Sequence, residues 1–145
     1  MELTFSPAAP GDAETIFRFA KGLIETYEDP LTIDLPRALE WTRRKIEKHI
    51  AEYTCVYADG EKAGYFRFCS CKNGMELDDL YIFPEYRCRG FGTAAVTRCI
   101  AQTDRPIELY VFTQNTGALR LYRRMGFEIT QQVSNTRCIL RREVL

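Results

Sequence analysis

The sequence predicts an α+β fold in which a mixed, mostly antiparallel sheet of about seven strands packs against four helices. This prediction rests on the order of the local patterns. A strand and two helices come first, three strands joined by hairpins follow, and a helix, a strand, a helix and two strands end the chain. The strand–helix–strand unit over residues 75–112 is the single crossover and should be parallel and right-handed.

The first 50 residues are expected to be mainly helical. After a strand candidate at residues 3–6, Asp12 can cap a first helix, because its carboxylate can accept from the free amides of the first turn. Apolar residues at helical spacing continue that helix to Tyr27. Asp34 begins a second helix, with a proline in its first turn. The apolar stripe of this second helix consists of Leu39, Thr42, Ile46 and Ile50.

From residue 53 onward most of the pattern is that of strands. Asp59 and Gly60 favour a hairpin turn, because both central positions of such a turn need positive φ. Helices are expected at residues 91–103 and 115–125, and Gly126 is suited to end the second of them. The expected strands cover residues 53–58, 63–71, 75–83, 107–112, 127–133 and 137–144.

Length and composition predict one globular domain over residues 1–145. Hydrophobic residues make up 46% of the chain, which excludes a disordered tail. Twenty basic and twenty acidic residues balance, which argues against nucleic acid or a membrane surface as a partner. No run approaches the roughly 18 apolar residues of a membrane span, and no secretory signal is visible. We therefore expect a cytoplasmic location.

Six cysteines are expected to be reduced and structural rather than disulfide-bonded. Four of them, Cys55, Cys69, Cys99 and Cys138, fall within apolar segments. No second cysteine pair or histidine cluster completes a zinc site, so no bound metal is expected. The single tryptophan, Trp41, and the single histidine, His49, are expected to be packing residues.

Residues 87–93 form a glycine-bearing loop between a strand and a helix. A helix N-terminus offers free amides and the positive end of the helix dipole, so a phosphate group can bind there. Gly90 and Gly92 allow close approach of the backbone, and Arg87 and Arg89 add positive charge. The alternative is an ordinary turn with two solvated arginines. The Walker pattern and the dinucleotide fingerprint both fit poorly.

Two motifs resemble the GNAT superfamily of acetyl-CoA-dependent N-acyltransferases. Residues 87–92, Arg-Cys-Arg-Gly-Phe-Gly, are similar to its R/Q-x-x-G-x-G/A loop, which grips the pyrophosphate of acetyl-CoA. About 20 residues further on, residues 111–127 are similar to the family's V-x-x-x-N-x-x-A-x-x-L-Y-x-x-x-G-F. The order of the expected elements also matches over essentially the whole chain. The resemblance implies a single acyl-CoA N-acyltransferase-like domain.

The implied activity is transfer of the acetyl group of acetyl-CoA to a primary amine by direct attack in a ternary complex, without a metal. The alternative is a module that binds acetyl-CoA, as a sensor or for a partner, without turnover. The acceptor is a small-molecule or peptide amine, and a polyamine, an aminoglycoside, an amino acid and a protein N-terminus all stay open. Homodimers are frequent in the resembled family.

The resemblance also implies which residues contact the cofactor. In the family, the strand before the loop splays from its neighbour, so that free amides pair with the pantetheine arm and the thioester carbonyl. Cys88 stands where members often have glycine, which leaves the fine geometry of the loop open. The residues implied in cofactor binding are Leu80, Tyr81, Ile82, Arg87, Cys88, Arg89, Gly90, Phe91, Gly92, Thr93 and Asn115.

The match places Tyr122 near the thioester sulfur, where its phenol, of ordinary pKa about 10, can protonate the departing thiolate. Spacing alone favours a core residue beside Phe127 for Tyr122, and it is the match that reverses this preference. The match assigns the role of base to Asp78, with Glu76 second, although a water chain often serves instead. Strand alternation predicts Glu76 and Asp78 on one face of the sheet and Asp79 on the other. Alternatively, these three carboxylates lie on a solvated face of the sheet or pair with arginine and take no part in catalysis.

Glu25, Tyr27, Glu28 and Asp29 lie between the first two expected helices. They are candidates for an anionic rim that attracts a cationic amine. They are equally the ordinary end of a helix.

Overall fold

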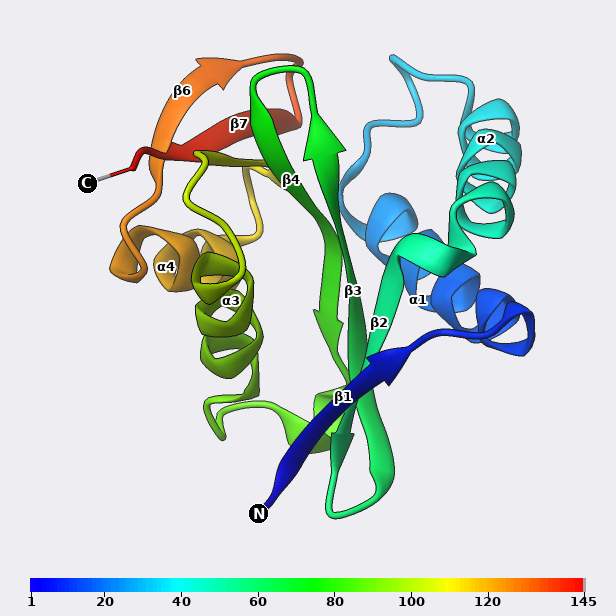
Figure 1. The fold of residues 1–145 in the computed structure, drawn as a ribbon. Coiled ribbons are helices and arrows are strands. Elements are labelled where there is room, and N and C mark those ends of the chain that lie inside the picture. The colour runs from blue at the N-terminus through cyan, green and yellow to red at the C-terminus, as the bar shows by residue number, and fades with distance from the viewer. Residues whose placement is uncertain (145) are drawn as a thin grey trace.

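The computed structural model describes residues 1–144, and Leu145, the last residue of the expected domain, lies outside the described residues. Figure 1 shows the strands and helices, most of which match the expected ranges within two or three residues. The strands are β1 (Leu3–Pro7), β2 (Tyr53–Ala58), β3 (Glu61–Cys71), β4 (Gly74–Ile82), β5 (Ile107–Phe112), β6 (Glu128–Gln132) and β7 (Arg137–Arg142). The helices are α1 (Ala13–Tyr27), α2 (Leu35–Lys48), α3 (Phe91–Ala101) and α4 (Thr116–Arg124).

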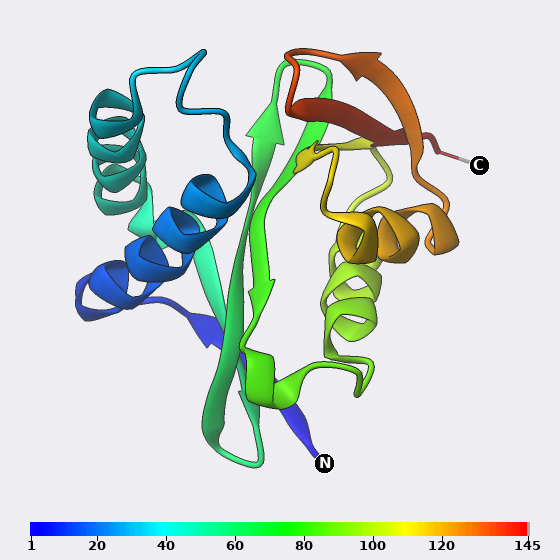
Figure 2. The same ribbon diagram turned by 180° about the vertical axis from the view of Figure 1, so that it is seen from behind.

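The strands form one sheet in the order β1-β2-β3-β4-β5-β7-β6. All neighbouring strands are antiparallel except β4 and β5, which are parallel and are joined through α3. Helices α1 and α2 cover one face of the sheet, and α3 and α4 cover the other (Figures 1 and 2). The predicted mixed, mostly antiparallel sheet with its single parallel crossover is therefore confirmed.

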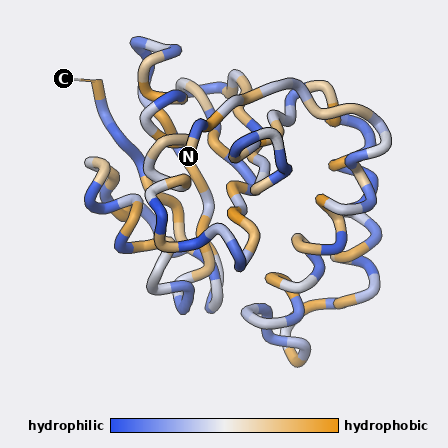
Figure 3. The backbone as a smooth tube through the Cα atoms, turned by 90° about the horizontal axis from the view of Figure 1, so that it is seen from below, coloured by the Kyte–Doolittle hydropathy of each residue, from blue (hydrophilic) through white to orange (hydrophobic). Residues whose placement is uncertain are grey.

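Each face of the sheet has its own hydrophobic core. Toward α3 and α4, Phe66, Leu77 and Leu109 of the sheet pack with Val96 and Phe127. Toward α1 and α2, the core is more aromatic; it contains Ile16, Ile46, Tyr53, Tyr65 and Phe83. Hydrophobic and hydrophilic residues alternate along the helices of both layers in Figure 3, as helices with one buried face require.

A β-bulge in β4 changes the faces that its residues occupy. Arg67 of β3 pairs with Asp78, but Tyr65 pairs with Tyr81, so β4 has one extra residue in this interval. Asp79, within the bulge, has φ 53°, a left-handed conformation that aspartate tolerates better than most residues. The prediction that Asp78 and Asp79 lie on opposite faces is therefore wrong. Both carboxylates contact Lys45 of α2.

Two expected helix caps have different outcomes. Asp34 caps α2 as predicted, because its carboxylate accepts from the amide of Arg37 at 3.2 Å. The cap predicted for Asp12 is wrong. Its carboxylate instead accepts from the amide of Ala9 at 2.8 Å and pairs with Lys62 of β3, since a short 3₁₀ turn precedes α1. Asp12 thereby ties the start of α1 to the sheet.

All six cysteines are free, and Cys88 is exposed. Cys55, Cys99 and Cys138 are buried, and Cys69 is half-buried. The prediction for Trp41 is wrong, because its side chain is 63% exposed. His49 is also not a core residue; it ends α2, and its Nδ1 lies 2.6 Å from Glu52 Oε1.

None of the helices over residues 1–144 is both long enough and apolar enough to cross a membrane. In the same part of the chain, no group of three or more His, Cys, Asp or Glu side chains is arranged to hold a metal ion.

Candidate active site

The site lies where β4 and β5 separate. Their pairing consists of Met75 with Ile107 and Glu76 with Glu108, and it ends there. From Leu77 onward, the edge of β4 that faces β5 has no strand partner in the described part of the chain. This agrees with the splayed strand that the loop motif implies.

Two adjoining pockets occupy this region. The first, which we call the β4–β5 pocket, has a volume of about 130 Å³ and lies toward α1 and α2. The second, the loop pocket, has a volume of about 480 Å³ and lies at the N-terminal ends of α3 and α4. Leu23, Leu80, Asn115, Ala118 and Tyr122 line both pockets. A molecule that fills one pocket can therefore reach a molecule in the other.

The loop pocket has the features expected of an anion cradle. Gly90 precedes the first turn of α3 and has φ 82°, in the left-handed region that favours glycine. A Cβ atom at Gly90 would meet no heavy atom within 4 Å, so the space above this residue is open. Ten of the eleven residues implied in cofactor binding line the loop pocket: Leu80, Tyr81, Ile82, Arg87, Cys88, Gly90, Phe91, Gly92, Thr93 and Asn115.

The exception is Arg89, which points elsewhere. Its guanidinium lies 5.9 Å from the centre of the Tyr86 ring and contacts the sulfur of Met1 at 3.7 Å. Arg87 is held against the end of β4, where its Nε donates to the carbonyl of Ile82 at 3.0 Å. Cys88 is exposed and has φ 61°, so this departure from glycine keeps the left-handed backbone conformation.

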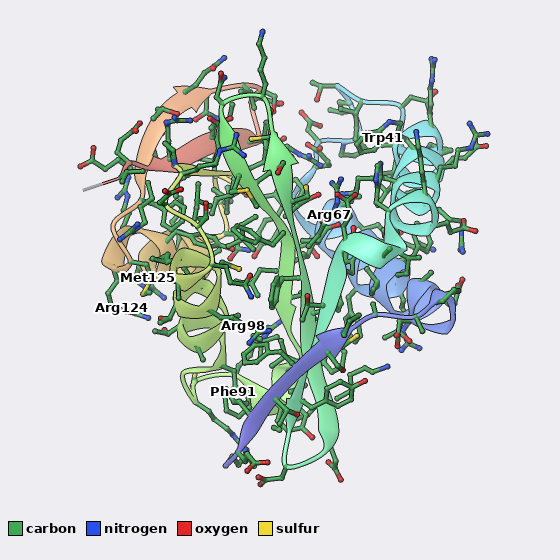
Figure 4. All side chains as sticks on the ribbon, in the orientation of Figure 1. Trp41, Arg67, Phe91, Arg98, Arg124 and Met125 are labelled. Atoms are coloured by element: carbon green, nitrogen blue, oxygen red, sulfur yellow. The ribbon has the colours of Figure 1, made fainter. Side chains whose placement is uncertain are left out.

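Helix α4 adds basic residues that the sequence analysis missed. Arg120 and Arg124 line the loop pocket, and Nη2 of Arg124, which Figure 4 labels, donates to the hydroxyl of Thr93 at 3.4 Å. Their spacing of four residues on a helix places both on one face, which is the signal that could have identified them. The positive charge in this pocket therefore comes from two elements.

Tyr122 combines the two roles that the sequence left open. Its ring packs edge-on against Phe127, with the ring centres 5.6 Å apart, and only 7% of the residue is exposed. It nevertheless lines both pockets. Burial, followed by the neighbouring Cys99 and Asp78, raises the pKa of Tyr122. The phenol is therefore protonated at neutral pH.

A compact charge cluster lies at the inner wall of the β4–β5 pocket. Lys45 Nζ donates to Asp78 at 3.0 Å and to Asp79 at 2.9 Å, and the Tyr53 hydroxyl donates to Asp79 at 2.6 Å. Arg67, labelled in Figure 4, donates to Asp78 at 3.3 Å. Nε of Arg67 is buried and has no partner in the described part of the chain.

One lysine shared by two carboxylates leaves neither carboxylate fully compensated. Burial and the charge of Asp79 raise the pKa of Asp78, against the opposite effect of Lys45 and Arg67. Burial lowers the pKa of Lys45, but the two carboxylates outweigh it and the net shift is upward. Glu76 is half-buried and lines neither pocket; burial and then Asp78 raise its pKa.

The expected anionic rim is largely compensated. Glu28, whose side chain is 11% exposed, accepts from Nε of Arg137 at 3.2 Å and from the hydroxyl of Thr136. Tyr27 stacks on Phe112 with 5.4 Å between ring centres and lines the loop pocket. Glu25 is exposed and lines neither pocket. These contacts favour the ordinary end of a helix over an anionic rim that attracts a cationic amine.

Asp29 of this set also makes structural contacts. Its carboxylate accepts from the amide of Leu31 at 2.9 Å and from the side-chain amide of Asn135 at 3.3 Å. The segment after α1 is thereby attached to the loop between β6 and β7.

The Lys45 cluster yields a stability prediction. Lys45→Met leaves two largely buried carboxylates, 19% and 21% exposed, without their shared cation, so we expect the free energy of unfolding at neutral pH to fall by about 3 kcal/mol. The exposed pair of Arg44 with Glu40 supplies the control, and Arg44→Met should cost less than about 0.5 kcal/mol. Urea unfolding measures both. When the pH falls through the raised pKa of Asp78, that carboxyl becomes neutral, and the loss of unfolding free energy in Lys45→Met should approach the loss in Arg44→Met. Equal losses in the two variants at neutral pH would contradict this account.

The fold has solved counterparts of similar length. The PaiA N-acetyltransferase from Thermoplasma acidophilum in complex with coenzyme A superposes with a TM-score of 0.72 and 19% identity, over 99% of this chain and 99% of that chain. At this level of identity, the likeness concerns the fold.

Sequence relatives and a family profile agree with this likeness. An uncharacterized N-acetyltransferase of Methanocaldococcus jannaschii, MJ1207, is 37% identical over 57 residues, or 37% of this chain and 25% of the relative. The spore coat polysaccharide biosynthesis protein SpsD of Bacillus subtilis is 27% identical over 135 residues, or 86% of this chain and 47% of the relative. The chain thus spans about a quarter and about half of the lengths of these curated relatives. The Acetyltransferase (GNAT) family model matches residues 18–127, and the chain belongs to this family.

Proposed function

We propose that this chain transfers the acetyl group of acetyl-CoA to a primary amine by direct attack in a ternary complex. The observation that carries the proposal is the junction of two pockets at Leu80, Asn115 and Tyr122, beside the unpaired edge of β4. Membership of the acetyltransferase family supports it. So does the similar fold of PaiA, which is in complex with coenzyme A.

The loop pocket is the proposed binding site of acetyl-CoA. Its volume of about 480 Å³ lies within the usual range for small-molecule sites, about 300–1,000 Å³. Free amides at the start of α3 and the guanidinium groups of Arg87 and Arg124 are suited to the phosphates. The amide of Phe83 donates to the carbonyl of Ala63 in β3 at 2.8 Å, so strand alternation turns the amides of Leu80 and Ile82 toward the open edge of β4, where they can pair with the pantetheine arm.

The β4–β5 pocket is the proposed acceptor site, with Asp78 as base. An ammonium has no lone pair, so the acceptor must lose a proton before it attacks. The raised pKa of Asp78 makes this carboxylate a better proton acceptor at neutral pH than an exposed aspartate. Asp78 acts directly or through a bound water, and Glu76 is its less well placed alternative because it lines neither pocket.

Tyr122 is the proposed acid. Acetyl-CoA supplies an acetyl group on a thioester; the amine nitrogen bonds to its carbonyl carbon and the carbon–sulfur bond breaks. Asp78 takes one proton from the ammonium before the attack. As the carbon–sulfur bond breaks, the Tyr122 hydroxyl gives its proton to the sulfur and takes up the second proton that the nitrogen loses, so Tyr122 is restored and Asp78 releases one proton to solvent. A backbone amide near Ile82 is the proposed donor to the acetyl oxygen. The raised pKa of Tyr122 keeps the acid loaded at neutral pH.

One observation favours a second function, binding of acetyl-CoA without turnover. Lys45 and Arg67 both donate to Oδ2 of Asp78, which leaves the proposed base partly occupied. Release of free thiol from acetyl-CoA in the presence of a panel of amines distinguishes the two functions. Binding of the cofactor without release on any amine would establish the second.

The acid role of Tyr122 leads to a kinetic prediction. Tyr122→Phe keeps the ring packing on Phe127 and removes the proton, so kcat should fall about a hundredfold while the Kd for coenzyme A changes less than about twofold. Thiol release measures the first quantity and calorimetry the second. Tyr57→Phe, on β2 and outside both pockets, is the matched control. Equal loss of turnover and of cofactor affinity in Tyr122→Phe would refute the assignment.

The phosphate cradle is tested by a pair of glycine variants. Gly90→Val should weaken coenzyme A binding more than about tenfold, because its side chain enters the open space above the loop. Gly60, in the β2–β3 turn, has the same φ of 82° and equally open surroundings, so Gly60→Val carries the same backbone strain away from the loop pocket. Thermal shift and calorimetry with coenzyme A compare them. Similar affinity in the two variants would count against the cradle.

A further inference from the structure

The β4–β5 pocket carries two exposed aromatic side chains that belong to none of the hydrophobic core clusters of the described residues. Trp41 of α2 is 63% exposed and Tyr110 of β5 is 51% exposed, and both line this pocket (Figure 4 labels Trp41). Large aromatic side chains normally contribute by burying their surface, so two of them at one pocket point to a ligand that covers them.

Each charged side chain of the same pocket already has an ion-pair partner within the protein. Lys45 is paired with Asp78 and Asp79, and Arg137 is paired with Glu28. A polyamine brings further ammonium groups that need further anions, and this pocket supplies no free carboxylate for them. Its charge pattern therefore favours an acceptor with a single amine.

Several polar groups in the lining are also occupied. The Thr42 hydroxyl donates to the carbonyl of Ala38 at 2.8 Å, and Oδ1 of Asn115 accepts from the amide of Ala118 at 3.3 Å. A sugar ring carries several hydroxyls, and each one buried without a partner costs binding free energy. The amine is therefore better matched to this pocket when its ring is apolar.

The size of the pocket fits one ring. Its volume of about 130 Å³ is close to the roughly 150 Å³ of an engineered apolar cavity that binds benzene. Leu23, Ile24 and Val111 supply apolar walls beside the two aromatic side chains.

We propose that the acceptor is an arylalkylamine, a primary amine that a short chain joins to one aromatic ring. The ring lies against Trp41 and Tyr110, and the amine reaches Asp78 at the inner wall. This inference rests on the proposed acetyl transfer, because it assigns the acceptor of that reaction. Trp41 and Tyr110 are binding residues for the acceptor and take no part in proton transfer.

Trp41 is the single tryptophan of the chain, so its emission reports the pocket without any turnover. The protein saturated with coenzyme A, which carries no acetyl group, is titrated with 2-phenylethylamine, glucosamine and putrescine. We expect a saturable change of emission with 2-phenylethylamine alone. A saturable change with glucosamine or putrescine at equal or lower concentration, or none with 2-phenylethylamine, would overturn the proposal.

Variants separate ring recognition from folding and from chemistry. Tyr110→Ala should raise the Kd for 2-phenylethylamine about tenfold, which corresponds to about 1.4 kcal/mol, and Tyr57→Ala should leave it unchanged. Trp41→Ala should raise the KM for 2-phenylethylamine about tenfold in the thiol-release assay without changing the KM for acetyl-CoA. Unchanged values in both Tyr110→Ala and Trp41→Ala would contradict the ring site.

The two proposals fail in different ways. Thiol release with putrescine or glucosamine but none with 2-phenylethylamine would leave acetyl transfer standing and remove the arylalkylamine assignment. A saturable emission change with 2-phenylethylamine but no thiol release from any amine would remove acetyl transfer, and with it the acceptor role, and would leave only a site that binds the ring.

Discussion

The early separation of β4 from β5 is the constraint on which the rest of the site depends. The two parallel strands pair only at Met75–Ile107 and Glu76–Glu108, so the following residues of β4 keep an open edge in the middle of the sheet. Backbone amides at such a place need a partner, and a buried amide without one is costly. Both pockets lie at this opening, and the residues that line both of them include Leu80 and Tyr122.

The bulge in β4 produces the second property of the site, its electrostatics. One extra residue opposite Phe66 places Asp78 and Asp79 together against Lys45 instead of on opposite faces. Three groups from other elements then stabilise the carboxylates, namely Lys45 of α2, Tyr53 of β2 and Arg67 of β3. Both carboxylates in the proposed acceptor pocket therefore have a cationic partner, and we propose that the shape and the aromatic lining of the pocket determine its selectivity.

Features that depend on local patterns could be predicted from the sequence. The hairpin at Asp59–Gly60, the cap of α2 at Asp34 and the loop ending at Gly90 each depend on a few neighbouring residues, and each is present. The family motif likewise consists of residues close together in the sequence, and it identified the elements that line the loop pocket. The cytoplasmic location and the homodimer stay predictions.

Features that depend on contacts between distant segments could not be predicted. The bulge at Asp79 is visible only in the register with β3, and the partner of Glu28 lies more than a hundred residues away, at Arg137. Trp41 was assigned to packing because helical spacing does not reveal that its helix borders a pocket. The four-residue spacing of Arg120 and Arg124 is a local pattern, but the contact of Arg124 with Thr93 requires α4 to lie beside the loop.

Hydrogen exchange of the β4 amides tests the central claim most directly. If the open edge of β4 and the start of α3 hold acetyl-CoA, exchange at Leu80, at Ile82 and at residues 90–93 should slow when coenzyme A is added, while exchange in the Asp59–Gly60 turn stays unchanged. Unaltered exchange at both segments with saturating coenzyme A would contradict the account.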